Sequence, residues 1–178
     1  MGYGLLDGRI EVRARVARQS YGWVYRQYPF IPGIHETQDK QWDNLRGAYV
    51  ADNQMHWIIK RGQLVQLQDS GTTSWHNKFD TSTTGVKTGG LRIYTHHGHE
   101  PPQRRDASLC HLVNLIVDTP VPVEELKLVS RRADNVEQKE YYTFEYDAHF
   151  EVSGASVDIS LIHGGRTLAT KYLTLRSE

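Results

Sequence analysis

The sequence contains one cysteine, Cys110, so the chain cannot form an internal disulfide bond. Proteins without disulfides are typical of reducing compartments, and this predicts a cytoplasmic protein. His111 follows Cys110 directly, but adjacent residues of a strand project from opposite faces. The pair is therefore poorly placed for proton transfer to a nucleophilic thiol, and we expect Cys110 to lie in the core.

The sequence also lacks an excess of charge and a long apolar run. Lys plus Arg and Asp plus Glu number 21 each, and the pI is about 7.1. This balance argues against nucleic acid or an anionic membrane as the main partner. No run approaches the about 18 apolar residues of a membrane-spanning helix, and no leader sequence is visible. We therefore expect a soluble protein.

Familiar catalytic motifs are missing as well. No GxSxG, HExxH, phosphate-binding loop or GxGxxG occurs in the sequence. Asp106, Glu124 and Glu125 lie in expected loops, and their spacing identifies no partner for acid–base chemistry. We expect no catalytic residues and no enzymatic activity.

Three histidines, His96, His97 and His99, lie in the stretch LRIYTHHGHEPP, residues 91–102. Neutral imidazole is a common metal ligand, and jelly-roll metalloenzymes of the cupin kind place two histidines two residues apart on a strand. In those enzymes a glutamate follows several residues later, whereas Glu100 follows at once here and would face away. We therefore expect a solvent-facing turn and no metal or other cofactor.

Alternation of apolar and polar residues with a period of two dominates the sequence, and this is typical of β-strands. Near the N-terminus, apolar side chains at Ile10, Val12, Ala14 and Val16 predict one buried face. The clearest alternation covers residues 142–175, interrupted by turn-forming pairs at 153–154 and 164–165. This pattern predicts a three-stranded antiparallel meander.

The remaining segments also predict β-strands. Further strands are expected at 21–27, 55–60, 72–79, 90–96 and 111–118. Residues 124–130 and 134–140 allow a helical turn or two at most, and no longer amphipathic helix is predicted. The chain is therefore expected to be all-β, an antiparallel β-sandwich of two sheets with about seven to nine strands and no helical lid.

Two segments interrupt the strand pattern and read as insertions. Residues 28–54 mix proline, glycine, charge and aromatic residues, among them Phe30, Trp42 and Tyr49. The segment is too long for a hairpin loop, and its aromatic residues predict a packed excursion. The Thr- and Gly-rich residues 79–90 are expected to form a mobile connection.

Aromatic residues are numerous, with four tryptophans and ten tyrosines. A sandwich rich in exposed aromatic rings is typical of carbohydrate-binding modules, in which rings stack on sugars. Tryptophans at strand positions also fill cores. Carbohydrate binding therefore remains one alternative function, and it requires coplanar exposed rings.

An ordered series of motifs runs through the chain. The series comprises RARVARQSYG (13–22), IHETQDKQWD (34–43), NQMHWIIKRGQLV (53–65), SWHNKF (74–79), LRIY (91–94), CHLVNLIVDTPVPVEE (110–125), YYTFEYDAHFEVSGASVDI (141–159) and GGRTLATKYLTL (164–175). In this order the motifs resemble the β-sandwich substrate-binding domain of the seventy-kilodalton heat-shock chaperones. The details resemble a divergent branch found in fungal proteins and one pair of animal proteins.

The resemblance implies a division of the chain. Residues 9–178 would form the substrate-binding-like sandwich, with residues 28–54 as an insertion absent from ordinary members. Residues 1–8 resemble the end of the final helix of the nucleotide-binding domain. Alternatively, they are only the starting residues of this chain. ATP would belong to that separate domain, so no cofactor is expected here.

The resemblance also implies a peptide groove. In the family, an extended peptide is held by backbone hydrogen bonds and an apolar pocket. Carried over to this chain, the groove residues are Trp23, Val24, Tyr25, Trp75, His76, Leu91 and Ile93. The expected partners are extended apolar peptides or unfolded protein, together with the protein's own nucleotide-binding domain. The implied function is substrate binding in an atypical chaperone of the stress response.

Two alternatives to an open groove remain. Trp75, Leu91 and Ile93 fit equally well as plain core residues, because apolar strand residues are usually buried. A groove blocked by Trp75 or by residues 28–54 would leave a regulatory or docking module.

Overall fold

The computed structural model describes residues 14–66, 69–82, 89–117, 121–133, 136–153 and 156–174. These residues form strands and two single-turn 3₁₀ helices, η1 (Thr37–Asp39) and η2 (Val123–Glu125). The strands are β1 (Ala14–Val16), β2 (Ser20–Gln27), β3 (Lys40–Asp43), β4 (Ala48–Ile59), β5 (Leu64–Gln66), β6 (Ser70–Asp80), β7 (Gly90–His96), β8 (Cys110–Ile116), β9 (Lys127–Ala133), β10 (Val136–Ser153), β11 (Ser156–His163) and β12 (Arg166–Thr174).

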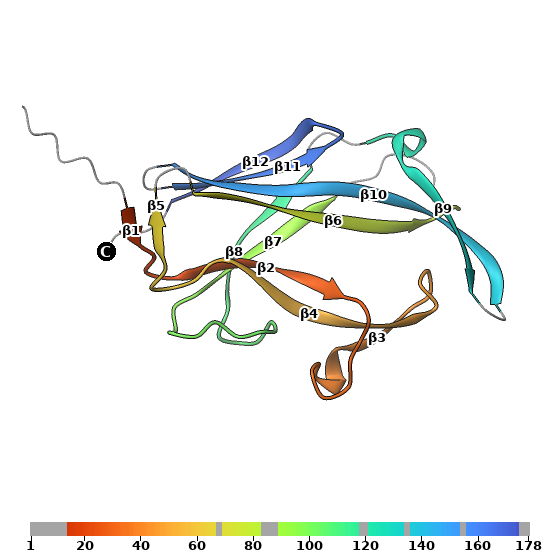
Figure 1. Cartoon of the computed structure of the whole chain (residues 1–178), viewed down its shortest axis with the longest axis horizontal. Coiled ribbons are helices and arrows are strands. Elements are labelled where there is room, and N and C mark those ends of the chain that lie inside the picture. The colour runs from red at the N-terminus through yellow and green to blue at the C-terminus, as the bar shows by residue number, and fades with distance from the viewer. Residues whose placement is uncertain are drawn as a thin grey trace, which may run out of the picture.

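The strands form two facing layers, which confirms the predicted antiparallel β-sandwich, but the described residues form twelve strands and not seven to nine. One sheet has the order β12-β11-β10-β6, and β9 also pairs with β10. The other sheet has the order β3-β4-β2-β7-β8, and β1 pairs with β5 in a separate two-stranded sheet. Figure 1 shows the layers close together near β1 and β5 and farther apart toward β3 and β9.

The core lies between the layers and follows the alternation seen in the sequence. From β10 and β11, the buried side chains include Phe144, Tyr146, Ala148, Val157, Ile159 and Leu161. The facing sheet contributes Trp23, Ile59, Leu91 and Ile93. The meander of β10, β11 and β12 is confirmed, and Gly164 and Gly165 form its second turn with φ of 55° and 78°. Positive φ at both positions is the backbone that a tight hairpin turn requires.

The strands expected at 21–27, 55–60, 72–79, 90–96 and 111–118 are all present, with shifted ends. The sequence allowed helical turns at 124–130 and 134–140, and this prediction is wrong beyond η2. Strands β9 and β10 contain most of these residues instead. Tyr141 pairs with Val129 and Tyr142 with Leu128. Pairing between two strands satisfies the backbone N–H and C=O groups of many residues, whereas a helix of one or two turns would satisfy few of them.

Two predicted core positions are exposed instead. Val16 is 60% exposed because β1 pairs only with β5, away from the two main layers. Cys110 is also exposed, because it begins β8 at the outer edge of its sheet. Ile10 and Val12 lie outside the described residues.

The insertion at 28–54 extends a sheet. It contains η1, β3 and the first part of β4, so much of it is paired strand. The buried carboxylate of Asp39, 1% exposed, accepts hydrogen bonds from Arg104 at 2.7 and 2.8 Å and from Asn53 at 3.1 Å. The Asp39–Arg104 pair therefore fastens the insertion to the segment that follows β7.

The segment after β7 runs along the edge of β4. Met55 N donates to the Gln103 carbonyl at 2.9 Å, and Arg105 N donates to the Asn53 carbonyl at 2.7 Å. The Trp57 indole donates to the Pro102 carbonyl at 2.8 Å. These bonds satisfy the β4 edge beyond the end of β3.

The connection expected to be mobile, 79–90, falls partly outside the described residues at 83–88. Its first residues belong to the end of β6, and its last residue begins β7. In the part of the chain that the structure describes, no helix is long and apolar enough to span a membrane.

Candidate functional site

The apolar pocket expected beneath the β7 strand is filled by core side chains. Leu91 is 5% exposed, and Ile93 and Trp23 are fully buried in the same core cluster. These three predicted site residues therefore face the interior of the sandwich. Val24 lies between Trp23 and Tyr25 on β2 and is half-buried on the opposite face.

An aromatic cluster of Trp23, Tyr25, His56 and Trp75 joins β2, β4 and β6. Trp23 stacks on His56 with ring centroids 5.1 Å apart, and its edge meets Trp75 at 6.0 Å. Tyr25 and His56 contact Trp75 at 5.3 and 5.8 Å. Rings at these separations and angles attract each other. Three of the four residues are ones that the resemblance assigned to the groove, and their packing against one another favours the closed-groove alternative.

Gly22 helps to build this cluster. A Cβ at Gly22 would lie 2.3 Å from the His56 carbonyl oxygen, and the pairing of β2 with β4 shifts register at Tyr21 and Gly22. Only glycine permits this close backbone approach. The shift sets Trp23 opposite His56, so both rings share one face.

Burial perturbs two titratable groups of the aromatic cluster. Burial raises the pKa of the Tyr25 phenol and lowers the pKa of the His56 imidazole. The His56 Nε2 lies 3.4 Å from the Thr73 hydroxyl. Near neutral pH the imidazole is therefore uncharged, as its apolar surroundings require.

The low pKa of His56 predicts a loss of stability in mild acid. The unfolded chain binds the proton at a pKa of about 6.5, and the folded chain binds it only at lower pH. The free energy of unfolding should therefore fall as the pH drops below about 6.5. Thermal unfolding between about pH 7.5 and pH 5.5 measures this slope, which His56→Gln should reduce. The exposed His99→Gln serves as the control, and an unchanged slope in His56→Gln would contradict the assignment.

A second feature, which we call the outer cleft, lies where β6, β10 and the β11–β12 turn meet. It is a cavity of about 470 Å³, and its lining includes Ser74, Trp75, His76, Glu145, Asp147 and His163. His76 pairs with Glu145, and Ser74 pairs with Asp147. Directly paired residues share one face of a sheet, and these alternate with buried core residues. The cleft therefore lies on the solvent side of the sheet.

The lining of the outer cleft is polar and carries two carboxylates. The Ser74 hydroxyl donates to Asp147 at 2.6 Å, and His163 Nδ1 lies 2.6 Å from the Glu145 carbonyl oxygen. Burial raises the pKa of Tyr146, a core residue that also borders the cleft, to about 12, so its phenol stays neutral. The described lining contains no Lys or Arg. The cleft therefore favours a cationic group over an anionic one.

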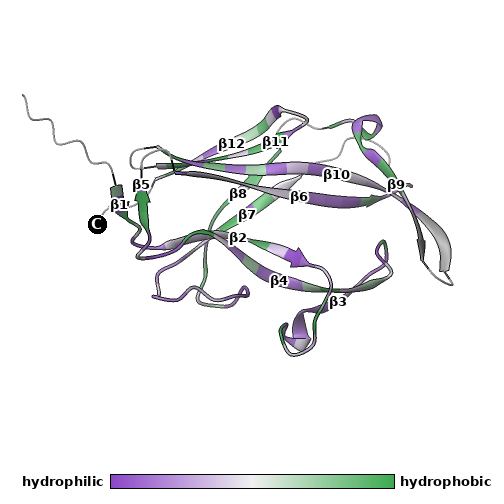
Figure 2. Cartoon of the chain, viewed as in Figure 1, coloured by the Kyte–Doolittle hydropathy of each residue, from purple (hydrophilic) through white to green (hydrophobic). Residues whose placement is uncertain are grey.

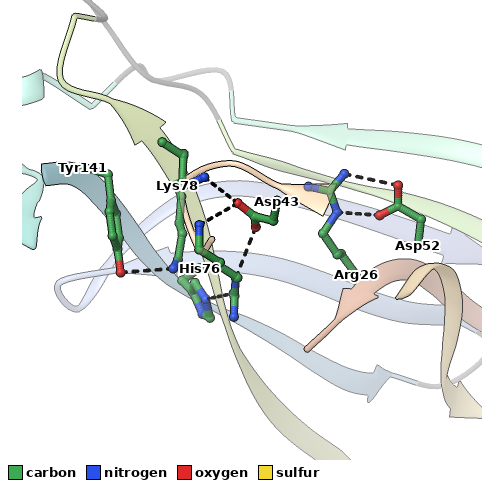
Figure 3. Close-up of polar contacts among 8 residues, drawn as sticks. Arg26, Asp43, Asp52, His76, Lys78 and Tyr141 are labelled. Atoms are coloured by element: carbon green, nitrogen blue, oxygen red, sulfur yellow. Dashed lines mark hydrogen bonds and ion pairs between the residues drawn. The ribbon is translucent and has the colours of Figure 1, made fainter. Parts of the chain in front are cut away.

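A turn from the other sheet reaches one end of the cleft. Arg46 lies between β3 and β4, and its guanidinium is 2.6 Å from His76 Nε2 and 3.3 Å from the Asp43 carboxylate. Figure 3 shows His76 and Asp43 near Lys78, whose ammonium donates to the Tyr141 hydroxyl at 3.1 Å. Burial, followed by the charges of Arg46 and Lys78, lowers the pKa of His76. His76 is therefore a neutral group at neutral pH.

β6 itself is an edge strand. All eleven of its residues pair with β10 without a shift in register. In the described part of the chain, no strand pairs with β6 on the side away from β10. Trp75 and His76 therefore stand in the middle of an edge, with the aromatic cluster on one face and the outer cleft on the other.

The structure thus brings Trp75 and His76 to a surface site but leaves Trp23, Leu91 and Ile93 in the core. Sequence reasoning missed His56, Arg46, Glu145 and Asp147. The alternation in β10 already placed Glu145 and Asp147 on one polar face, so that signal was available. No local pattern indicated that Arg46 would reach His76 thirty residues away.

The histidines after β7 do not gather into a metal site. His96 ends β7 and is 9% exposed beside Trp57, so the expectation that all three face solvent is wrong for this residue. His96 pairs with Ser20 at the end of β7, and its ring lies against Trp57, outside the core cluster between the sheets. His97 and His99 are exposed. Among the residues that the structure describes, no group of three or more His, Cys, Asp or Glu could hold a metal ion.

The exposed aromatic pair of the insertion bears on carbohydrate binding. Trp42 and Tyr49 are 52% and 48% exposed, with ring centroids 5.0 Å apart and planes at 72°. Lys40 lies over the Tyr49 ring at 4.1 Å. Perpendicular rings, one of them covered by a cation, do not form the flat platform on which a sugar stacks.

Fold and site define an antiparallel β-sandwich with a polar cleft beside β6, which is an edge strand among the residues that the structure describes. The chain matches the family described as a domain of unknown function, DUF8568, over residues 15–172. It therefore belongs to this family, and the matched region runs from β1 into β12. No curated protein and no solved structure matches the chain.

Proposed function

We propose that this domain binds extended polypeptide segments and carries out no catalysis. Binding would occur at the surface around Trp75 and His76, in place of a pocket beneath Leu91 and Ile93. The observation that carries the proposal is the position of Trp75 and His76 at the centre of an edge strand that borders the outer cleft. Sheet edges and adjacent side-chain pockets are the common means of sequence-tolerant peptide binding.

Two further observations support peptide binding. The ordered motifs resemble the substrate-binding sandwich of the seventy-kilodalton heat-shock chaperones over nearly the whole chain. The outer cleft, at about 470 Å³, falls within the range of about 300 to 1,000 Å³ typical of ligand pockets. The domain would then be the substrate-binding part of an atypical, cytoplasmic chaperone. ATP would bind to a separate nucleotide-binding domain of that protein.

Peptide binding is tested by fluorescence polarisation with labelled, extended peptides that alternate apolar and polar residues. His76→Ala should weaken binding about tenfold, because it removes a side chain at the centre of the site. Trp75→Phe, which keeps an aromatic ring packed against the core, should weaken binding less. His99→Ala is the matched control on the surface and should bind as the original chain does. Equal affinities of His76→Ala and the original chain would count against this site.

A docking module is the second candidate, and the closed aromatic cluster favours it. In this case the sandwich would recognise a folded partner, including its own nucleotide-binding domain, and short peptides would not bind. Isothermal titration of the domain with the separately expressed nucleotide-binding domain, beside the peptide measurement, distinguishes the two. Binding of the folded partner without binding of peptides would select the docking module.

A further inference from the structure

We propose that the ligand adds a strand to the edge of β6 along residues 70–78 and places a Lys or Arg opposite Ser74. This inference rests on the proposed peptide-binding function, and it names where the peptide lies and which residue it must carry. The occupant is an extended segment of another polypeptide in which a basic residue stands between apolar ones.

The β6 edge has few of the features that prevent strand addition. Natural edges are protected by proline, bulges, inward charges, lysine or a covering loop, and here Arg46 of the β3–β4 turn contacts His76 at 2.6 Å. β6 contains no proline, and its pairing with β10 has no bulge. Its single lysine, Lys78, is held at one end by the Tyr141 hydroxyl and ring. Figure 2 shows that β6 is mostly hydrophilic, so the edge is compatible with solvent before a ligand binds.

An added strand would present its side chains alternately to two different surfaces. Successive side chains of a strand point to opposite faces of a sheet. On the inner face the neighbour is Trp75, which is half-buried against Tyr25. On the outer face the neighbours are Ser74 and His76, at the rim of the outer cleft. Apolar residues are therefore favoured on the inner side and a cleft-filling residue on the outer side.

The charge of the cleft selects the outer residue. Glu145 and Asp147 contribute two carboxylates, and the described lining contains no Lys or Arg. Lys127 approaches Glu145 at 3.7 Å, but their side chains are 68% and 61% exposed. Such an exposed pair is weak and readily exchanged. A basic residue of the ligand would therefore gain two partners in the cleft.

Distance restricts the ligand residue further. An added strand would lie two strand spacings from β10, about 9 to 10 Å. Lys and Arg carry their charge at the end of a long methylene stem and can cross this distance. Between the added strand and Asp147 stands only the small side chain of Ser74. The route to Glu145 is occupied by His76 and the Arg46 side chain that contacts it. The basic residue is therefore placed opposite Ser74.

The charge preference is tested with three otherwise identical peptides that carry Lys, Gln or Glu at the central outer position. Fluorescence polarisation should give an affinity for the Lys peptide about tenfold higher than for the Gln peptide, as expected for a charge-assisted hydrogen bond. The Glu peptide should bind most weakly. Glu145→Gln combined with Asp147→Asn should abolish the difference, and about 1 M salt should reduce it. Glu151→Gln, on the same strand and face, is the matched control.

Strand addition is tested with peptides methylated on single backbone nitrogens. Methylation should abolish binding at alternate positions, where the N–H faces β6, and should have little effect at the others. No binding by any peptide would overturn the proposed function itself. Binding with equal affinity for Lys and Gln would overturn only the basic residue, and insensitivity to methylation would overturn strand addition. A domain that sediments as a dimer through β6 would replace the external segment with a second copy of this chain.

Discussion

Replacing Ile93 with alanine is expected to lower the free energy of unfolding by about 2 to 5 kcal/mol. Ile93 is fully buried between the two sheets, so the substitution removes apolar contacts and leaves a cavity. Ile116, on the neighbouring strand β8, is 55% exposed. Ile116→Ala is the matched control and should change stability by about 0.5 kcal/mol or less. Urea unfolding followed by tryptophan fluorescence measures both.

This pair of variants decides whether β7 serves the core or a peptide groove. A residue that lines an open pocket contributes to binding and little to folding. A loss below about 1 kcal/mol in Ile93→Ala, together with weaker peptide binding, would restore the groove implied by the resemblance. A large loss of stability with peptide affinity retained in the folded fraction would confirm Ile93 as a core residue.

Replacing Asp39 with asparagine is expected to lower the free energy of unfolding by about 2 to 3 kcal/mol. Removing one partner of a buried ion pair typically destabilises by about 3 to 5 kcal/mol, because the other charge is left uncompensated. The loss should be smaller here because the Arg104 side chain remains 27% exposed. The more exposed pair of Arg26, on β2, and Asp52, within the insertion, provides the control. Asp52→Asn should lower stability by less than about 1 kcal/mol.

The Asp39 variant should also loosen the insertion. Hydrogen bonds from Arg104 hold the pKa of Asp39 below its ordinary value, so the stabilisation is present above about pH 4 and is lost as the pH falls through the folded pKa. Limited proteolysis should cut residues 28–54 faster in Asp39→Asn than in Asp52→Asn. Equal stability and equal cleavage of the two variants would show that Asp39 does not anchor the insertion.

Much of the sandwich could be predicted because its strands carry their own pattern. The alternation of Tyr142 to Val152 in β10 indicated both the strand and its buried face, and the glycine pair at 164–165 located the next turn. The short segments around β1 and β9 could not be predicted as reliably. Their environment depends on which strand they pair with, and pairing joins residues far apart in sequence.

The candidate site was predictable only in part for the same reason. The resemblance placed Trp75 and His76 in one groove with Trp23, Leu91 and Ile93, whereas the structure buries these last three residues in the core. The outer cleft depends on the register of β6 against β10, which sets His76 beside Glu145. The contact of Arg46 with His76 joins the β3–β4 turn of one sheet to the middle of β6 in the other. Neither relation leaves a local signal in the sequence.

An extended peptide bound along the edge of β6 would change the surroundings of that strand's backbone amides. An NMR titration of the isotope-labelled domain with the Lys-containing peptide tests this binding most directly, because each backbone amide reports its own surroundings. The largest shifts, and new protection from hydrogen exchange, should fall on residues 70–78 and around Glu145 and Asp147. Shifts confined to residues 91–93 and 23–25, or no shifts at a saturating peptide concentration, would contradict binding along β6.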